Sequence, residues 1–217
     1  MDTEQARFNM VEQQIRTWDV LDDHVLDIIQ STPREAFVPI QHQSLAFADL
    51  EIPLGYDQVM MSPKVEGRML QALQLSVEDK VLEIGTGSGF VTSCLAKMSR
   101  HVTSYEINEG LAEQARRRIK DQNLSNVEIV VADIFHSLPI HNHYDVIAVT
   151  GSSPSELDQL AGLLETGGRM FSIIGEQPVM TATLTTCISP RSYRKENLFE
   201  TSLTSLVMAK KEKEFTF

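Results

Sequence analysis

A cluster of glycines and carboxylates follows a short apolar run near the middle of the chain. Residues 83–89 have the sequence EIGTGSG, and a helical pattern begins directly after Gly89. Glycine accepts positive φ and lets the backbone approach a ligand closely, and the start of a helix presents free N–H groups. A second acid, Glu106, ends the next apolar run, about 20 residues past the turn. A carboxylate at that place can accept hydrogen bonds from both ribose hydroxyls of a nucleoside.

Three kinds of ligand suit a glycine turn between a strand and a helix. A P-loop phosphate site is excluded, because no Gly-Lys-Ser/Thr follows the turn. A dinucleotide prefers G-x-G-x-x-G, whereas the glycines here are Gly85, Gly87 and Gly89, and Glu83 disfavours a pyrophosphate. Glu83 suits a cation instead, and S-adenosylmethionine carries a sulfonium, an ammonium and no phosphate. The pattern therefore favours an S-adenosylmethionine site over a tight turn that binds no ligand.

The ends of the neighbouring strands complete this predicted site. Asp133 ends the third predicted strand, where it suits the adenine amino group, although aspartate at such a place also forms turns and helix N-caps. The acids all lie at one edge of the predicted sheet, where α/β folds bind ligands. The predicted cofactor-binding residues are Glu83, Gly85, Thr86, Gly87, Ser88, Gly89, Glu106, Ile107, Asp133 and Ile134.

The elements that must position these residues alternate between strands and helices. Strands are predicted at residues 80–84, 102–105, 127–132, 144–150 and 169–174, with helices at residues 90–98, 111–122 and near 155–164. This alternation implies a mostly parallel sheet that is covered on both faces. Two further β-type runs, at residues 181–188 and 197–208, have no helix between them, so we expect them to pair antiparallel.

The first third of the chain has a different pattern. Residues 4–16 and 20–31 are predicted to be helical, with Asp19 as the N-cap of the second helix, and a third helix is expected from about residue 64 to residue 75. Repeated prolines make residues 32–63 mostly loop with short elements. We therefore predict one Rossmann-like domain over residues 1–217, in which residues 1–75 form a helical and loop cover over the cofactor-binding core at 76–217.

Composition limits the classes of partner. The net charge of −11 argues against a general nucleic-acid binder, because an acidic protein repels phosphate backbones. No apolar run approaches the ~20 residues that a membrane span needs, and residues 1–16 lack the apolar core of a signal peptide. A cytoplasmic protein is therefore expected. The spacing of His136, His141 and His143 matches no common metal site, so no metal is predicted.

Further motifs extend over nearly the whole chain. Residues 33–39 have the sequence PREAFVP, residues 46–49 AFAD, residues 52–58 IPLGYDQ and residues 167–169 GGR. Together with the glycine turn, they resemble motifs of the protein-L-isoaspartate O-methyltransferase family. The resemblance implies an enzyme that uses S-adenosylmethionine to methylate the α-carboxylate of isoaspartyl residues in proteins or peptides, which starts the repair of aged proteins. A carboxylate with a pKa near ~4 is already the nucleophile at neutral pH, so no general base is required.

The resemblance also implies a substrate side, where this chain departs from the family. The family loop T-I-S-Q-P contains a serine that is taken to hydrogen-bond the substrate carboxylate. Alignment on Gln58 and Pro63 puts Met61 in the place of that serine, and alignment on the serine selects Ser62 as the catalytic residue. The predicted substrate-side residues are Val59, Met60, Met61 and Thr150, although Thr150 suits a helix cap equally well.

Two more departures concern the substrate more than the cofactor. Ile134 occupies a place where the family has glycine, and residues 204–207 lack the family's threonine. Two alternatives to isoaspartyl methylation therefore remain open: a methyltransferase of the same scaffold that acts on another substrate, and a cofactor-binding homologue that has lost its catalytic activity.

Overall fold

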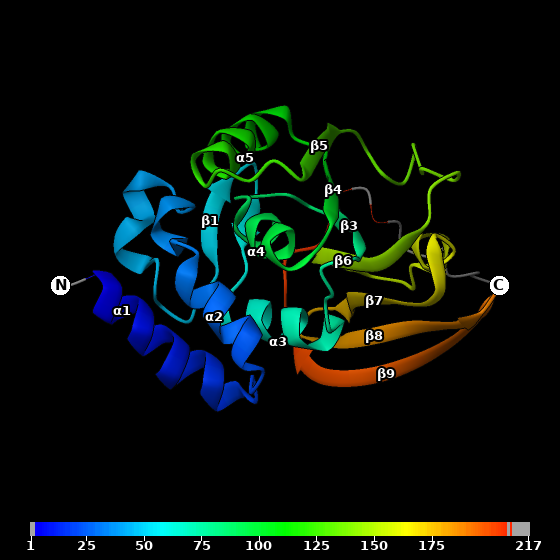
Figure 1. The fold of residues 1–217 in the computed structure, drawn as a ribbon, viewed down its shortest axis with the longest axis horizontal. Helices are drawn as coiled ribbons and strands as arrows, with labels where there is room; N and C mark the ends of the chain where they lie inside the picture. Colours follow the sequence, from blue (N-terminus) through cyan, green and yellow to red (C-terminus); the bar gives the residue numbers. More distant parts are fainter. Residues whose placement is uncertain (1–2, 208, 210–217) are drawn as a thin grey trace.

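One large sheet forms the centre of the molecule (Figure 1). The structure is a computed structural model, and it describes residues 3–207 and residue 209. The strands of this sheet are β3 (Lys80–Ile84), β4 (His101–Glu106), β5 (Val127–Val131), β6 (Tyr144–Ser153), β7 (Leu164–Glu176), β8 (Val179–Ser189) and β9 (Ser192–Thr201). Their order across the sheet is β5-β4-β3-β6-β7-β8-β9.

The parallel part of the sheet has the predicted character. Strands β3 to β7 pair parallel with one another. Helix α4 (Phe90–Met98) connects β3 to β4, and α5 (Glu109–Asp121) connects β4 to β5. The predicted antiparallel pairing of the last two runs is also confirmed, since β9 pairs antiparallel with β8, which pairs antiparallel with β7. Strand β9 begins earlier than predicted and ends at Thr201, and Met208 lies outside the described residues.

The two faces of the sheet bury different sets of apolar side chains. Val81 belongs to the cluster that packs against the N-terminal helices and α4, whereas its neighbour Leu82 belongs to a second cluster on the opposite face. This alternation follows from the two-residue period of a strand. In the described part of the chain, a short helix, α6 (Asp158–Ala161), and loop residues such as Ile134 pack on the second face.

The helix predicted near residues 155–164 is therefore wrong in extent. Only residues 158–161 are helical, and β7 begins at Leu164. The hydroxyl of Ser153 donates to the carbonyl oxygen of Ser155 at 2.7 Å and accepts from its N–H at 3.4 Å. A local side-chain-to-backbone bond of this kind gives the chain an alternative to a helical turn.

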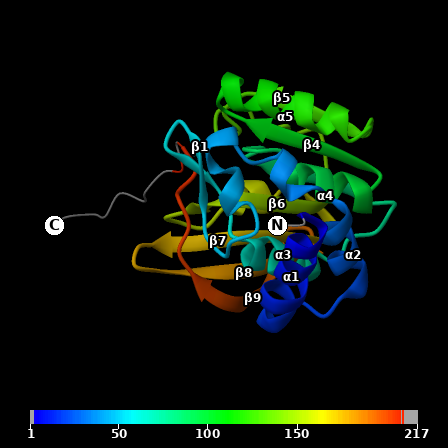
Figure 2. The same ribbon diagram turned by 90° about the vertical axis from the view of Figure 1, so that its left-hand side faces the viewer.

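Three helices make up most of the N-terminal cover, which lies in front of the sheet in the view of Figure 2. They are α1 (Thr3–Met10), α2 (Asp23–Ser31) and α3 (Pro63–Leu73). After α1 the chain continues through a π-helical segment (Val11–Ile15) and a 3-10 turn (Arg16–Trp18). The three helices predicted in the first third of the chain are thus present. None of the helices in the described part of the chain is long and apolar enough to cross a membrane.

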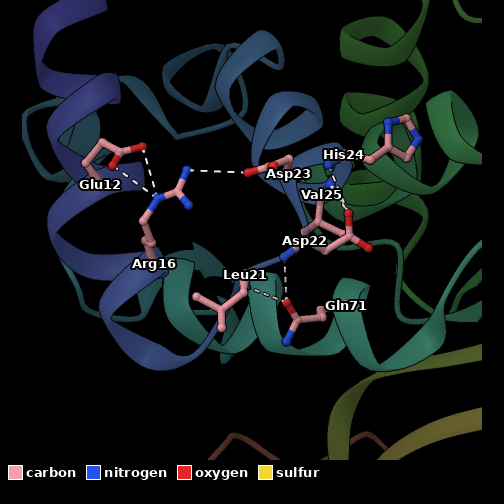
Figure 3. A network of polar contacts seen from close by, with 8 residues as sticks. All are labelled: Glu12, Arg16, Leu21, Asp22, Asp23, His24, Val25 and Gln71. Atoms are coloured by element: carbon pink, nitrogen blue, oxygen red, sulfur yellow. Dashed lines mark hydrogen bonds and ion pairs between the residues drawn. The ribbon is translucent and has the colours of Figure 1, made fainter.

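The prediction that Asp19 caps the second helix is wrong. Asp19 has a φ of 59° and lies at the end of the preceding 3-10 turn. Asp22 is the N-cap of α2, because its Oδ1 accepts from the N–H groups of His24 at 2.9 Å and Val25 at 3.3 Å (Figure 3). Both aspartates precede the same apolar pattern, and only the left-handed backbone at Asp19 decides between them.

A glutamine of α3 connects this helix to the start of α2 (Figure 3). The Oε1 of Gln71 accepts from the N–H groups of Leu21 at 2.6 Å and Asp22 at 3.0 Å, and its Nε2 donates to the carbonyl oxygen of Asp19 at 2.7 Å. These bonds satisfy backbone groups in the connection before α2. The start of α2 is thereby joined to α3, the helix of the cover that directly follows the predicted substrate loop.

A hairpin lies inside the stretch that the sequence predicted as mostly loop. Strands β1 (Ile52–Gly55) and β2 (Gln58–Met60) pair antiparallel. The turn residues Tyr56 and Asp57 both have positive φ, 54° and 57°, which is the backbone of a type I′ hairpin turn. The hairpin places Val59 beside the glycine turn, where it lines the cavities described below.

The cap assignment predicts a difference between two neighbouring aspartates. Replacing Asp22→Ala should lower the free energy of unfolding by about 1 kcal/mol, because two N–H groups of α2 lose their acceptor. Asp19→Asn, which keeps a side chain that tolerates the left-handed region, should change it by less than about 0.5 kcal/mol. Urea denaturation of both variants measures the difference, and equal effects would contradict the assignment.

Candidate functional site

A cavity opens at the carboxyl ends of the parallel strands. Its volume is about 70 Å³, on the same measure as the volumes given below for two neighbouring cavities. The predicted site residues that line it are Val59, Gly85, Gly87, Glu106, Ile107, Asp133, Ile134 and Thr150. The fold thus brings eight predicted residues together from the hairpin, the glycine turn and the ends of β4, β5 and β6.

The glycine turn requires its first glycine. Gly85 has a φ of 95°, and a Cβ atom there would lie 2.5 Å from the Oγ1 of Thr150. That hydroxyl donates to the turn, with the carbonyl oxygens of Gly85 at 2.5 Å and Ile84 at 2.9 Å. Thr150 therefore holds the end of β3 in place as well as lining the cavity. It lies within β6 and caps no helix.

Gly89 has a different position from the two glycines before it. It is the N-cap of α4 with a φ of 86°, and a Cβ atom there would lie 3.1 Å from the Cβ of Ala115 in α5. Gly89 lines none of the cavities described here. Its small size lets α4 and α5 pack closely, so it supports the turn from behind.

The carboxylate of Glu106 is held by two backbone groups. Its Oε2 accepts from the N–H of Gly87 at 2.8 Å, and its Oε1 accepts from the N–H of Asn108 at 3.0 Å. A carboxylate oxygen has two lone pairs, so each oxygen retains capacity for a further donor. Glu106 is therefore fixed at the cavity with acceptors available to a ligand.

Charge in the cavity has a single sign. Among the residues that the structure describes, Glu106 and Asp133 are the charged ones in its lining, and none of the others is a lysine, arginine or histidine. A phosphate or pyrophosphate would lack a counter-charge there, whereas a cation would be favoured. Within residues 3–207 and 209, no group of three or more His, Cys, Asp or Glu side chains is arranged to bind a metal ion.

Asp133 forms a turn, which is one of the two roles that the sequence left open, and it also faces the cavity. Its Oδ1 accepts from the N–H of Phe135 at 2.9 Å and its Oδ2 contacts the Nδ1 of His136, as expected of a turn former. It also lines the cavity, together with the buried Ile134. The turn therefore orients this carboxylate at the end of β5.

Glu83 does not lie where the sequence analysis expected it. Its side chain is fully buried and lines neither the main cavity nor the two neighbouring cavities described below. Its Oε2 accepts from the hydroxyls of Thr92 and Ser104, each at 2.6 Å, so it joins α4 to β4 beneath the turn. Burial raises the pKa of Glu83 to about 8, which the two hydroxyls oppose and nearby Glu106 adds to. Glu83 is therefore mostly protonated at neutral pH.

Two further cavities adjoin the main one on the predicted substrate side. A narrow cavity of about 30 Å³ is lined by the predicted residues Thr86, Ser88, Met60 and Met61 and by Glu66. A second cavity, of about 230 Å³, is lined by Ser62 and Met61. Met61 therefore lies between the two, and Ser62, which is the N-cap residue of α3, faces the outer one.

Sequence reasoning missed one wall of the main cavity. This wall is a segment that runs beside the end of β6 and contributes Leu203, Thr204, Leu206 and Val207. The N–H of Ser152 donates to the carbonyl oxygen of Thr204 at 3.0 Å, and the N–H of Leu206 donates to that of Ser152 at 2.9 Å. The family resemblance at residues 204–207 was the available signal, but it does not say that this segment returns to the glycine turn.

Comparison with known proteins identifies the family. The model of the protein-L-isoaspartate (D-aspartate) O-methyltransferase family matches residues 5–192. The protein-L-isoaspartate O-methyltransferase of Photorhabdus laumondii is 37% identical over 163 residues, which cover 75% of this chain and 78% of the relative. That of Rhodopseudomonas palustris is 31% identical over 201 residues, 92% of each chain.

A solved structure has the same fold. The crystal structure of a Plasmodium falciparum protein described as a protein-L-isoaspartate O-methyltransferase, in complex with S-adenosyl-L-homocysteine, superposes with a TM-score of 0.78 at 19% identity. The match covers 92% of this chain and 97% of that chain. Together with the family match over most of its length, these similarities show that the chain belongs to the protein-L-isoaspartate (D-aspartate) O-methyltransferase family.

Proposed function

We propose that this protein transfers the methyl group of S-adenosylmethionine to the α-carboxylate of isoaspartyl residues in proteins and peptides. The chain is a methyltransferase by family. The observation that supports this cofactor is the cavity at the strand ends, whose charged lining residues are the carboxylates of Glu106 and Asp133. S-adenosylmethionine is a cationic nucleoside without phosphate, so its charge matches this lining.

Individual contacts can be assigned from the geometry. We assign Glu106 to the ribose hydroxyls, because its oxygens are held by Gly87 and Asn108 and retain free lone pairs. Asp133, one strand further along the sheet, is assigned to the adenine amino group. The backbone of Gly85 and Gly87 lies between these acids and the hairpin, where the amino-acid end of the cofactor would extend.

The reaction needs little acid–base chemistry from the protein. When bound, the cofactor supplies an electrophilic methyl group. The substrate carboxylate, with a pKa near ~4, is ionised at neutral pH and attacks without a general base. The chain's contribution is to hold this carboxylate in line and exclude water, and alignment of this kind can supply on the order of 7–11 kcal/mol. The apolar side chains of Val59, Met60 and Met61 suit the exclusion of water.

The outer cavity of about 230 Å³ is our candidate for the peptide substrate. It combines the hydroxyl-bearing residues Ser62, Thr201 and Ser202 with a Lys64–Asp49 ion pair of 2.8 Å. Ser62 is the candidate for the hydrogen bond to the substrate carboxylate, and Met61 remains the alternative position. We further propose that the protein acts in the cytoplasm. Its substrate is proposed to be protein rather than nucleic acid, because the chain's net charge of −11 repels phosphate backbones.

The substrate assignment predicts selective labelling. An isoaspartyl peptide should accept a radiolabelled methyl group with a kcat/KM at least about 100-fold higher than its aspartyl twin, because a carboxylate displaced by about 1 Å loses that much rate. The twin has the same sequence and charge, so it controls for peptide binding. Equal, negligible labelling of both peptides would refute isoaspartyl methylation and leave the alternatives of another substrate or a non-catalytic binder.

Two variants decide which loop residue contacts the substrate. If the hydroxyl of Ser62 donates to the carboxylate, Ser62→Ala should lower kcat/KM by roughly 10- to 150-fold, the loss expected for a hydrogen bond to a charged group. Met61→Leu, which keeps an apolar side chain of similar volume, should change it by less than about 3-fold in the same assay. An unaffected Ser62→Ala enzyme would remove Ser62 from the site.

The cofactor assignment predicts a severe effect at one carboxylate. Glu106→Ala removes the proposed acceptor of two ribose hydroxyls and the acceptor of the Gly87 N–H, so affinity for S-adenosylmethionine should fall at least about 100-fold. Glu109→Ala is the matched control, because Glu109 is exposed in the first turn of α5 and lines no described cavity. Calorimetric titration measures both variants, and unchanged affinity in Glu106→Ala would contradict the ribose contact.

A further inference from the structure

One buried carboxylate oxygen has no partner beside the glycine turn. Glu66, in α3, is 1% exposed. Its Oε2 bonds to the guanidinium of Arg34, whereas its Oε1 is buried without a hydrogen-bond partner among the described residues. Buried acceptors in folded proteins are nearly always satisfied, so an unsatisfied one in a family of enzymes indicates a missing donor.

The guanidinium of Arg34 bonds to other acceptors and makes no hydrogen bond to Oε1 of Glu66. Arg34 is fully buried, and its Nε donates to the carbonyl oxygen of Ala46 at 2.9 Å. One terminal nitrogen donates to the carbonyl oxygen of Met61 at 2.7 Å and the other to Glu66 Oε2. Three separate acceptors thus fix the orientation of the guanidinium and leave Oε1 of Glu66 unpaired.

Glu66, whose Oε1 is unpaired, lines the narrow cavity, which continues the cofactor cavity. Val59, Gly85, Gly87 and Thr150 line both cavities. Glu106 lies in the main cavity and Glu66 in the narrow one, so the shared residues separate the two acids. An elongated ligand with its ribose at Glu106 would direct its other end along the turn toward Glu66.

Size and charge specify what that end must carry. The narrow cavity measures about 30 Å³, which suits one or two groups of the size of a water molecule. Burial raises the pKa of Glu66 to about 7, against the opposing effect of Arg34. A cationic donor at Oε1 would satisfy the oxygen and favour the ionised carboxylate.

We propose that Oε1 of Glu66 binds the α-ammonium group at the amino-acid end of S-adenosylmethionine. This inference rests on the proposed function, because it assumes that S-adenosylmethionine is the ligand. It adds a third cofactor-binding carboxylate to the two already assigned, with Glu106 at the sugar, Asp133 at the adenine amino group and Glu66 at the ammonium. It also distinguishes Glu66 from Glu83, whose unpaired oxygen is buried beneath the turn and lines no described cavity.

The test compares two ligands that differ only in the ammonium. The first is S-adenosylhomocysteine, and the second is its deamino analogue, in which hydrogen replaces the α-ammonium. Calorimetry on the wild-type protein should give at least about 10-fold tighter binding of the first ligand, as expected for a charged hydrogen bond. The Glu66→Gln variant should bind the two ligands with affinities within about 2-fold of each other. Its side-chain carbonyl oxygen would face Arg34 and its amide N–H groups would face the cavity, so it would offer the ammonium no acceptor.

Controls separate the possible outcomes. Glu106→Ala should weaken both ligands by the same factor, because the ribose is present in each. Glu66→Asp withdraws the carboxylate by one methylene and should also reduce the preference for the ammonium, which keeps the test available if Glu66→Gln does not fold. An unchanged preference in a folded Glu66 variant would overturn the inference, as would a wild-type protein that binds both ligands equally. Failure of the wild-type protein to bind S-adenosylhomocysteine would refute the proposed function instead.

Discussion

The buried guanidinium of Arg34 joins the parts of the molecule that must meet at the site. It bonds to the loop at Ala46, to the substrate loop at Met61 and to α3 at Glu66, and it lies 4.9 Å from the ring centroid of Phe90 in α4. An unpaired buried charge costs several kcal/mol, so loss of the Glu66 partner would destabilise this arrangement strongly. The geometry of the predicted substrate loop therefore depends on the N-terminal cover as much as on the core.

The turn region uses three carboxylates in different electrostatic states. Glu106 meets the cavity and accepts hydrogen bonds from two backbone N–H groups. Glu83 lies beneath the turn, where burial raises its pKa to about 8 and keeps it neutral. Its neutrality avoids a second negative charge next to Glu106, so the cavity keeps its cation preference without repulsion inside the sheet. Burial raises the pKa of Glu66 to about 7, and Arg34 partly offsets this effect.

The arrangement of the cavities suits a transfer between two ligands. The main cavity and the outer cavity are separated by residues of the hairpin and the following loop, and Leu203 lines both. A cofactor and a peptide could therefore approach each other from opposite sides of the Met61 region while apolar side chains keep water out. Methyl transfer to a carboxylate needs this geometry more than it needs a proton acceptor.

Local sequence was sufficient for features that depend on a few neighbouring residues. The glycine turn, the parallel strands and the acids at their ends follow from hydrophobic periodicity and from the conformations that glycine allows, so Gly85, Glu106 and Asp133 could be assigned to the cavity from sequence. Tertiary structure decided where packing and long-range contacts control the outcome. It turned Glu83 into the interior, left Oε1 of Glu66 without a donor, returned residues 203–207 to the turn and made Asp22 rather than Asp19 the cap. Sequence shows that a side chain is polar, but only packing against distant residues determines which face it occupies and whether its hydrogen bonds are made.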